Sequence, residues 1–140
     1  MNIYKSLQLL LLAATILLSC TDDSNDSFTN KDDTLTNAGI WRVTYYWDKD
    51  KDETSDFAGY TFVFEQGGVF KATKTGTTTT GNWQINSSGN RLIINTGVTT
   101  KPLDDLNDDW IITEKANKRI KLKDDRDGDD GDELLTLEVL

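Results

Sequence analysis

The sequence contains no histidine, one cysteine and one proline. With Cys20 as its sole thiol, the chain can form neither an internal disulfide bond nor a metal site built from nitrogen and sulfur ligands. Catalysis by a serine–histidine–aspartate or cysteine–histidine arrangement is excluded as well, because no histidine base is present. We therefore expect a non-catalytic protein that an apolar core stabilises.

Basic residues are also scarce: 15 lysines and arginines face 24 acidic residues, which gives a formal net charge of -9. Such a charge repels polyanions, so nucleic acid and anionic lipid headgroups are not expected partners. An acidic surface keeps a domain soluble, and it also suits a cationic protein partner.

Residues 1–19 have the features of a secretory signal peptide. Lys5 precedes an apolar run at 7–18, and the segment contains no acidic residue. This run is shorter than the roughly 20 apolar residues that a transmembrane helix needs, so it predicts a transient targeting segment.

The signal segment ends in Leu17-Leu18-Ser19-Cys20, which resembles the lipobox of bacterial lipoproteins. The resemblance implies that the Cys20 thiol receives a diacylglycerol, that cleavage occurs before Cys20, and that the new amino terminus can be acylated. Two or more acyl chains anchor a protein stably, whereas one binds only marginally. The alternative is an ordinary cleaved signal peptide followed by a buried free thiol. We predict a lipid anchor in the outer membrane of a bacterial cell envelope.

Residues 20–37 are predicted to form a flexible acidic tether, since 21–27 are polar and show no periodicity. The acidic cluster directly after Cys20 also resembles the export signal that sends lipoproteins of Bacteroidota to the cell surface. A solvated spacer is the alternative, so surface and periplasmic positions both stay open.

Residues 38–140 are predicted to form one all-β domain. The side chains of Trp41, Val43, Tyr45 and Trp47 alternate with polar ones and are expected to share one face of a strand. Further strands are expected, in chain order, at 60–65, 69–74, 77–85, 91–96, 110–113, 120–123 and 135–139. No segment has a convincing helical periodicity.

Eight short strands at this spacing indicate an antiparallel up-and-down meander. A meander closes most simply into a β-barrel, which leaves no exposed edge strand; an open sandwich is the alternative. Gly67-Gly68 is expected to form a hairpin turn, because tight turns require positive φ. Leu103 and Leu106 are expected to hold the connection at 97–108 against the core.

Three short motifs support a family resemblance: Gly39-Ile40-Trp41, the alternating aromatics Tyr60, Phe62 and Phe64, and Thr80-Gly81-Asn82-Trp83. In this order they look like the lipocalin-like lipoproteins of Bacteroidota, over about residues 38–140. The resemblance implies a lipocalin-like (calycin) β-barrel in which Gly39 and Trp41 close one end.

Five aromatic residues are the candidate lining of a ligand cavity: Tyr45, Tyr60, Phe62, Trp83 and Trp110. Amphipathic aromatic side chains are common in binding pockets, and a barrel interior would suit a small apolar or amphipathic ligand. The alternative is an eight-stranded barrel that its own side chains fill.

The acidic run at 125–133 is the nearest approach to a calcium site, because calcium prefers clustered oxygen ligands. An EF-hand loop that starts at Asp125 requires glycine where Asp130 stands and glutamate where Thr136 stands. Weak calcium binding and a solvated turn are the two interpretations of this run; no other cofactor is expected.

Three functions are compatible with these features. The first is a membrane-anchored envelope lipoprotein that binds a small apolar or amphipathic ligand in its barrel. The second is a surface or periplasmic protein-interaction module, such as an inhibitor or accessory subunit, that uses the acidic loops at 48–56 and 124–133. The third, which the sequence favours least, is a carboxylate-based glycan enzyme.

Overall fold

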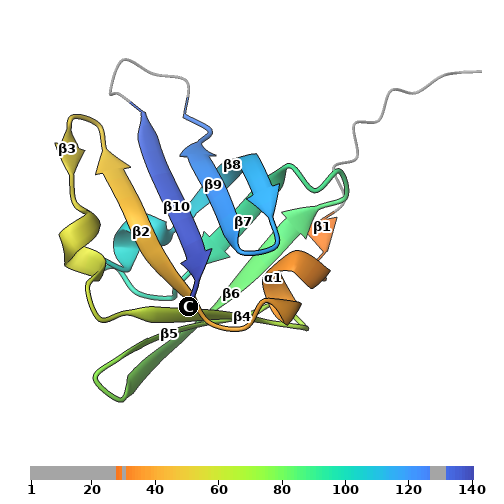
Figure 1. Cartoon of the computed structure of the whole chain (residues 1–140), viewed down its shortest axis with the longest axis horizontal. Helices are drawn as coiled ribbons and strands as arrows, with labels where there is room; N and C mark the ends of the chain where they lie inside the picture. Colours follow the sequence, from red (N-terminus) through yellow and green to blue (C-terminus); the bar gives the residue numbers. More distant parts are fainter. Residues whose placement is uncertain (1–27, 30, 127–131) are drawn as a thin grey trace, which may run out of the picture.

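The computed structural model describes residues 28–29, 31–126 and 132–140, and the signal peptide and Cys20 lie outside them. The described chain consists almost entirely of antiparallel strands (Figure 1). The strands are β1 (Phe28–Thr29), β2 (Trp41–Asp48), β3 (Lys51–Asp52), β4 (Thr61–Glu65), β5 (Val69–Lys74), β6 (Thr77–Asn86), β7 (Arg91–Asn95), β8 (Asp108–Ala116), β9 (Arg119–Asp124) and β10 (Glu133–Val139). One α-helical turn, α1 (Asp33–Asn37), and two 3-10 turns, η1 (Thr54–Phe57) and η2 (Asp104–Leu106), complete the fold.

Eight of these strands form a closed barrel. The hydrogen-bonded order runs β6-β5-β4-β2-β10-β9-β8-β7, and β7 pairs back to β6. Each strand pairs with the next in sequence, and the β2–β10 ladder joins the first strand to the last. The up-and-down barrel predicted from the sequence is therefore confirmed, and the open sandwich is not formed.

One end of the barrel is closed by α1. Asp32 caps this helix by accepting hydrogen bonds from the main-chain N–H groups of Thr34 and Leu35, at 3.0 and 3.1 Å. Leu35 is completely buried, and its carbonyl oxygen accepts a hydrogen bond from Trp41 Nε1 at 3.1 Å. The tether predicted at 20–37 was placed too far along the chain, because β1 and α1 belong to the folded domain.

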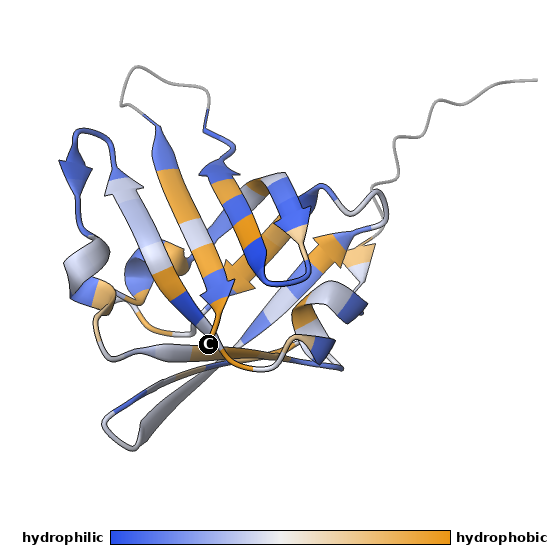
Figure 2. Ribbon diagram, viewed as in Figure 1, coloured by the Kyte–Doolittle hydropathy of each residue, from blue (hydrophilic) through white to orange (hydrophobic). Residues whose placement is uncertain are grey.

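Apolar and polar residues alternate along β9 and β10 (Figure 2), and the buried positions of these strands, which face the barrel interior, are mostly apolar. On β9, Ile120 and Leu122 point inward, while the lysines between and after them do not. The expected inward positions of Leu103 and Leu106 are confirmed, since both side chains are buried beneath the β7–β8 connection. Within the described residues, no helix is long and apolar enough to span a membrane.

Gly81 allows β6 to pass close to the end of β7. A Cβ atom at this position would lie 2.7 Å from the Thr96 Cα and closer still to the Asn95 carbonyl oxygen. Both obstacles are main-chain atoms, so rotation of a side chain cannot relieve the overlap. Glycine at this position is therefore a packing requirement of the closed barrel.

Gly81→Ala should consequently separate β6 from β7 and lower the free energy of unfolding by about 1–3 kcal/mol, the usual cost of overpacking. Urea unfolding followed by tryptophan fluorescence measures this change. Thr80→Ala, on the exposed neighbouring position, is the matched control and should cost less than about 0.5 kcal/mol. Equal stability of the two variants would contradict the packing argument.

Candidate functional site

The five aromatic residues predicted to line a cavity do not share one environment. Phe62, Trp83 and Trp110 are completely buried in the core, and Tyr60 is partly exposed. Tyr45 is 37 % exposed on the outside of β2, so its predicted inward position is wrong. The cause is a β-bulge at Thr44, which has no partner on β10 and reverses the alternation. Tyr46, 1 % exposed, points inward instead.

The buried aromatic side chains pack on one another as core. Phe62 stacks on Phe70 with ring centroids 5.8 Å apart, and Phe64 meets Trp83 edge-on at 5.7 Å. Trp83 Nε1 donates to the Glu65 carbonyl oxygen at 3.0 Å, and Trp110 Nε1 donates to that of Leu106 at 3.1 Å. These indoles thus have both their apolar and their polar contacts satisfied within the protein, which favours the filled-barrel alternative.

Three acidic connections meet at the end of the barrel opposite α1: those between β2 and β4, β7 and β8, and β9 and β10. The first and third are joined by a main-chain hydrogen bond from Lys49 N to the Asp132 carbonyl oxygen, at 3.2 Å. We call the following ion-pairing residues the charged rim: Asp48, Glu53, Lys101, Asp105, Asp108, Asp124, Arg126 and Glu133.

Two cations organise the charged rim. Lys101 Nζ lies 3.2 Å from Glu53, 3.3 Å from Asp105 and 3.6 Å from Asp48, so one ammonium group joins the first two acidic connections. Hydrogen bonds to Glu53 and Asp105 raise the pKa of Lys101, and the hydrogen bonds from Lys51 and Lys101 lower the pKa of Glu53.

Arg126 performs the same role on the other side of the barrel end. Its guanidinium group lies 2.7 Å from Glu133, 2.9 Å from Asp108 and 3.5 Å from Asp124. Asp124 is itself buried and accepts a hydrogen bond from the Glu133 main-chain N–H at 3.1 Å. Arg126 therefore joins β8, β9 and β10 across the mouth of the barrel.

Carboxylates outnumber cations in the charged rim, and burial adds to their repulsion. Burial raises the pKa of Glu133, with further increases from Asp48, Asp108 and Asp124, while Arg126 opposes the shift. Burial also raises the pKa of Asp105, against the effect of Lys101. The Tyr46 hydroxyl donates a 3.4 Å hydrogen bond to the Glu133 carboxylate, and burial raises the pKa of Tyr46 as well. The rim is thus electrostatically strained. The side chains of its carboxylates are 2–22 % exposed, whereas those of Lys101 and Arg126 are 58 % and 61 % exposed, so the exposed negative charge lies on the acidic connections around the rim.

Metal binding is not evident from the geometry of the described residues, which contain no group of three or more suitable ligands. Residues 127–131 of the predicted calcium loop lie outside the described residues, so calcium binding there stays a prediction. The sequence shows the acidic runs of the rim but gives no sign that Lys101 and Arg126 join them.

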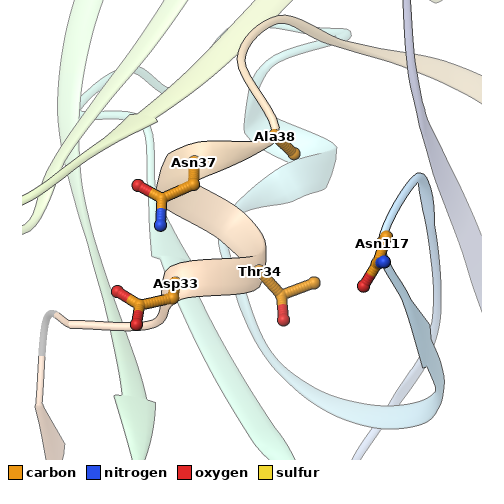
Figure 3. Close-up of a pocket in the computed structure, with 5 residues that line it drawn as sticks. All are labelled: Asp33, Thr34, Asn37, Ala38 and Asn117. Atoms are coloured by element: carbon orange, nitrogen blue, oxygen red, sulfur yellow. The ribbon is translucent and has the colours of Figure 1, made fainter.

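Two surface pockets lie away from the rim. A polar pocket of about 250 Å³ separates α1 from the β8–β9 turn, and Figure 3 shows Thr34 and Asn117 on its opposite sides. A second pocket, of about 330 Å³, is cut into the barrel wall where β2 and β4 diverge. We call this second pocket the wall pocket. Tyr60 lines it, whereas Phe62, Trp83 and Trp110 line neither pocket.

A solved structure with a similar fold is that of a DUF4847 family protein from Bacteroides vulgatus. The two chains are 14 % identical and superpose with a TM-score of 0.53, over 77 % of this chain and 96 % of the other. At this identity, the similarity shows the fold alone. No protein-family model and no curated protein matches this chain.

Glu133→Gln tests the electrostatics of the rim. Because the folded-state pKa of Glu133 is raised, its ionised form costs stability at neutral pH. That cost disappears as the pH falls through the folded-state pKa toward the ordinary value of about 4.3. The variant should therefore be more stable than the wild type at about pH 7.5, with a smaller difference at about pH 4.5. Urea unfolding at both values measures the difference.

Glu138→Gln, on the same strand but outside the rim, controls for the loss of one negative charge. A stability difference for Glu133→Gln that stayed constant between the two pH values would contradict the raised pKa.

Proposed function

We propose that this chain is a non-catalytic lipoprotein of a bacterial cell envelope that presents the acidic connections around the charged rim to a cationic protein partner. Lipid on Cys20 holds it to the outer membrane. The observation that carries the proposal is the convergence of three acidic connections, distant in sequence, on one end of the barrel.

The position of the rim supports this proposal. The chain enters the domain through β1, which pairs with the end of β6 at Ile85 and Asn86, beside the end that α1 closes. The rim lies at the other end of the barrel. A protein tethered through its amino-terminal segment would thus hold its negative surface away from its point of attachment.

The packing of the core favours an interaction module rather than a carrier that binds its ligand inside the barrel. The aromatic residues at the centre are buried against one another, and their indole N–H groups already have main-chain acceptors. Binding between them would require repacking of a dense interior. Small-ligand binding remains the second candidate function, because the wall pocket offers a separate place for it.

The anchor is tested by Cys20→Ser. Since the thiol is the atom that would carry the lipid, the variant should leave the membrane fraction, or stay as an uncleaved precursor. Fractionation and intact mass measurement of the expressed protein distinguish these results. Membrane attachment of a cleaved Cys20→Ser protein at the wild-type level would refute lipidation.

The exposed carboxylates around the rim are tested by the triple change Asp50→Asn, Asp52→Asn and Asp104→Asn, called the triple rim variant. These carboxylates are exposed on the acidic connections, and asparagine keeps an oxygen that can accept the hydrogen bonds from Thr54 and Asn107. We expect the triple variant to lose most of the cross-linking to a specific partner in envelope extracts, because charge complementarity drives the encounter.

The matched control removes three negative charges elsewhere, by Asp33→Asn, Glu65→Gln and Glu138→Gln. If both triple variants lose the partner equally, net charge and not the rim is responsible. Unchanged cross-linking of the rim variant would count against the interaction module itself.

A further inference from the structure

The wall pocket arises from the way β4 joins the barrel. The β2–β4 ladder has one register pair, Trp41 with Phe62, and the two segments diverge beyond it. Residues 57–61 then form one side of the pocket, and Arg42 and Val43 of β2 form the other. Its volume of about 330 Å³ lies within the range of small-molecule sites.

Two of the three large apolar residues that are exposed in the described part of the chain lie at this pocket. Leu140, which lines it, is 65 % exposed, and Ile40 beside it is 49 % exposed. The two residues are held together by a hydrogen bond from Leu140 N to the Ile40 carbonyl oxygen, at 2.9 Å. The half-buried Tyr60 and Val43 extend the same surface. Contiguous exposed apolar side chains of this kind favour a ligand.

Two cations border this apolar surface. Arg42 lines the pocket, and Lys74 Nζ lies 4.6 Å from the centroid of the Tyr60 ring, within range of a cation–π contact. The other three arginines, Arg91, Arg119 and Arg126, each form an ion pair. Among the described residues, neither Arg42 nor Lys74 is ion-paired with a carboxylate.

Two such cations are unusual in this chain, because its 24 acidic residues offer many carboxylates that could pair with them. Glu138 stands opposite Arg42 in the β2–β10 register, yet no ion pair joins them. The pocket therefore presents two cations that have no ion-pair partner in the described part of the chain, next to an apolar surface. Its complement is a molecule with an acid group at one end and an apolar body.

We propose that the wall pocket binds a small amphipathic anion, free in solution, whose apolar body covers Val43, Tyr60 and Leu140. Its acid group meets Arg42 and Lys74. This site is separate from the charged rim and from the barrel interior, so it does not depend on the proposed protein partner.

Anilinonaphthalene sulfonate, an amphipathic anion, and phenylnaphthylamine, a neutral dye with a similar ring system, provide a matched pair of probes. The protein is the chain from residue 20 with Cys20→Ser, because every core side chain lies between Leu35 and Leu137. Fluorescence titration should give saturable binding of the anion. Arg42→Gln and Lys74→Gln should each weaken it by about fivefold, the effect expected of one exposed charge contact, with little change for the neutral dye.

Lys118→Gln, in the β8–β9 turn, removes the same charge away from the pocket and should leave both affinities unchanged. Leu140→Asp should weaken both dyes, because it removes apolar surface. Three results would each overturn the proposal: no saturable binding of the anion, equal weakening by Lys118→Gln, or anion affinity unaffected by Arg42→Gln and Lys74→Gln. The triple rim variant should bind the anion at least as well as the wild type, so the two proposals fail independently.

Discussion

The β2–β10 ladder is the constraint on which the rest of this structure depends. It closes the barrel by pairing the first long strand with the last, from Trp41 opposite Val139 to Asp48 opposite Glu133. In closing the barrel it brings Asp48 and Glu133 side by side: Asp48 is followed by the first acidic connection of the rim, and Glu133 follows the third. The burial that raises the pKa of Glu133, and the repulsion from Asp48 that adds to it, are therefore consequences of closure, and Arg126 is the counter-charge that opposes the shift.

The same ladder explains where sequence reasoning succeeded and where it failed. Strand positions follow from period-two alternation, a local property, and the eight barrel strands agree with the prediction to within a few residues. The bulge at Thr44 has no local signal, since threonine is an ordinary strand residue, and it reversed the predicted positions of Tyr45 and Tyr46. The turn α1 is too short for helical periodicity, although Asp32 ahead of it is a recognisable cap.

The candidate sites were less predictable than the fold, because both arise from contacts between distant segments. The acidic runs at 48–56 and 124–133 are visible in the sequence, but their meeting depends on the β2–β10 pairing. Aromatic content alone does not distinguish a cavity from a filled interior. Here the distinction rests on acceptors such as the Leu106 carbonyl oxygen, which reaches the Trp110 indole only after the β7–β8 connection has folded over the barrel.

The rim and the wall pocket follow from opposite sides of one strand. On one side β2 pairs along its length with β10, and on the other its ladder with β4 has one pair, which leaves room for the pocket. The exposed carboxylates on the acidic connections disfavour anions at that end of the barrel, whereas the cations at the wall pocket favour them. A small amphipathic anion would be repelled at the mouth and retained beside Arg42. A cationic protein would have the reverse preference, so one acidic barrel can keep two kinds of ligand on separate surfaces.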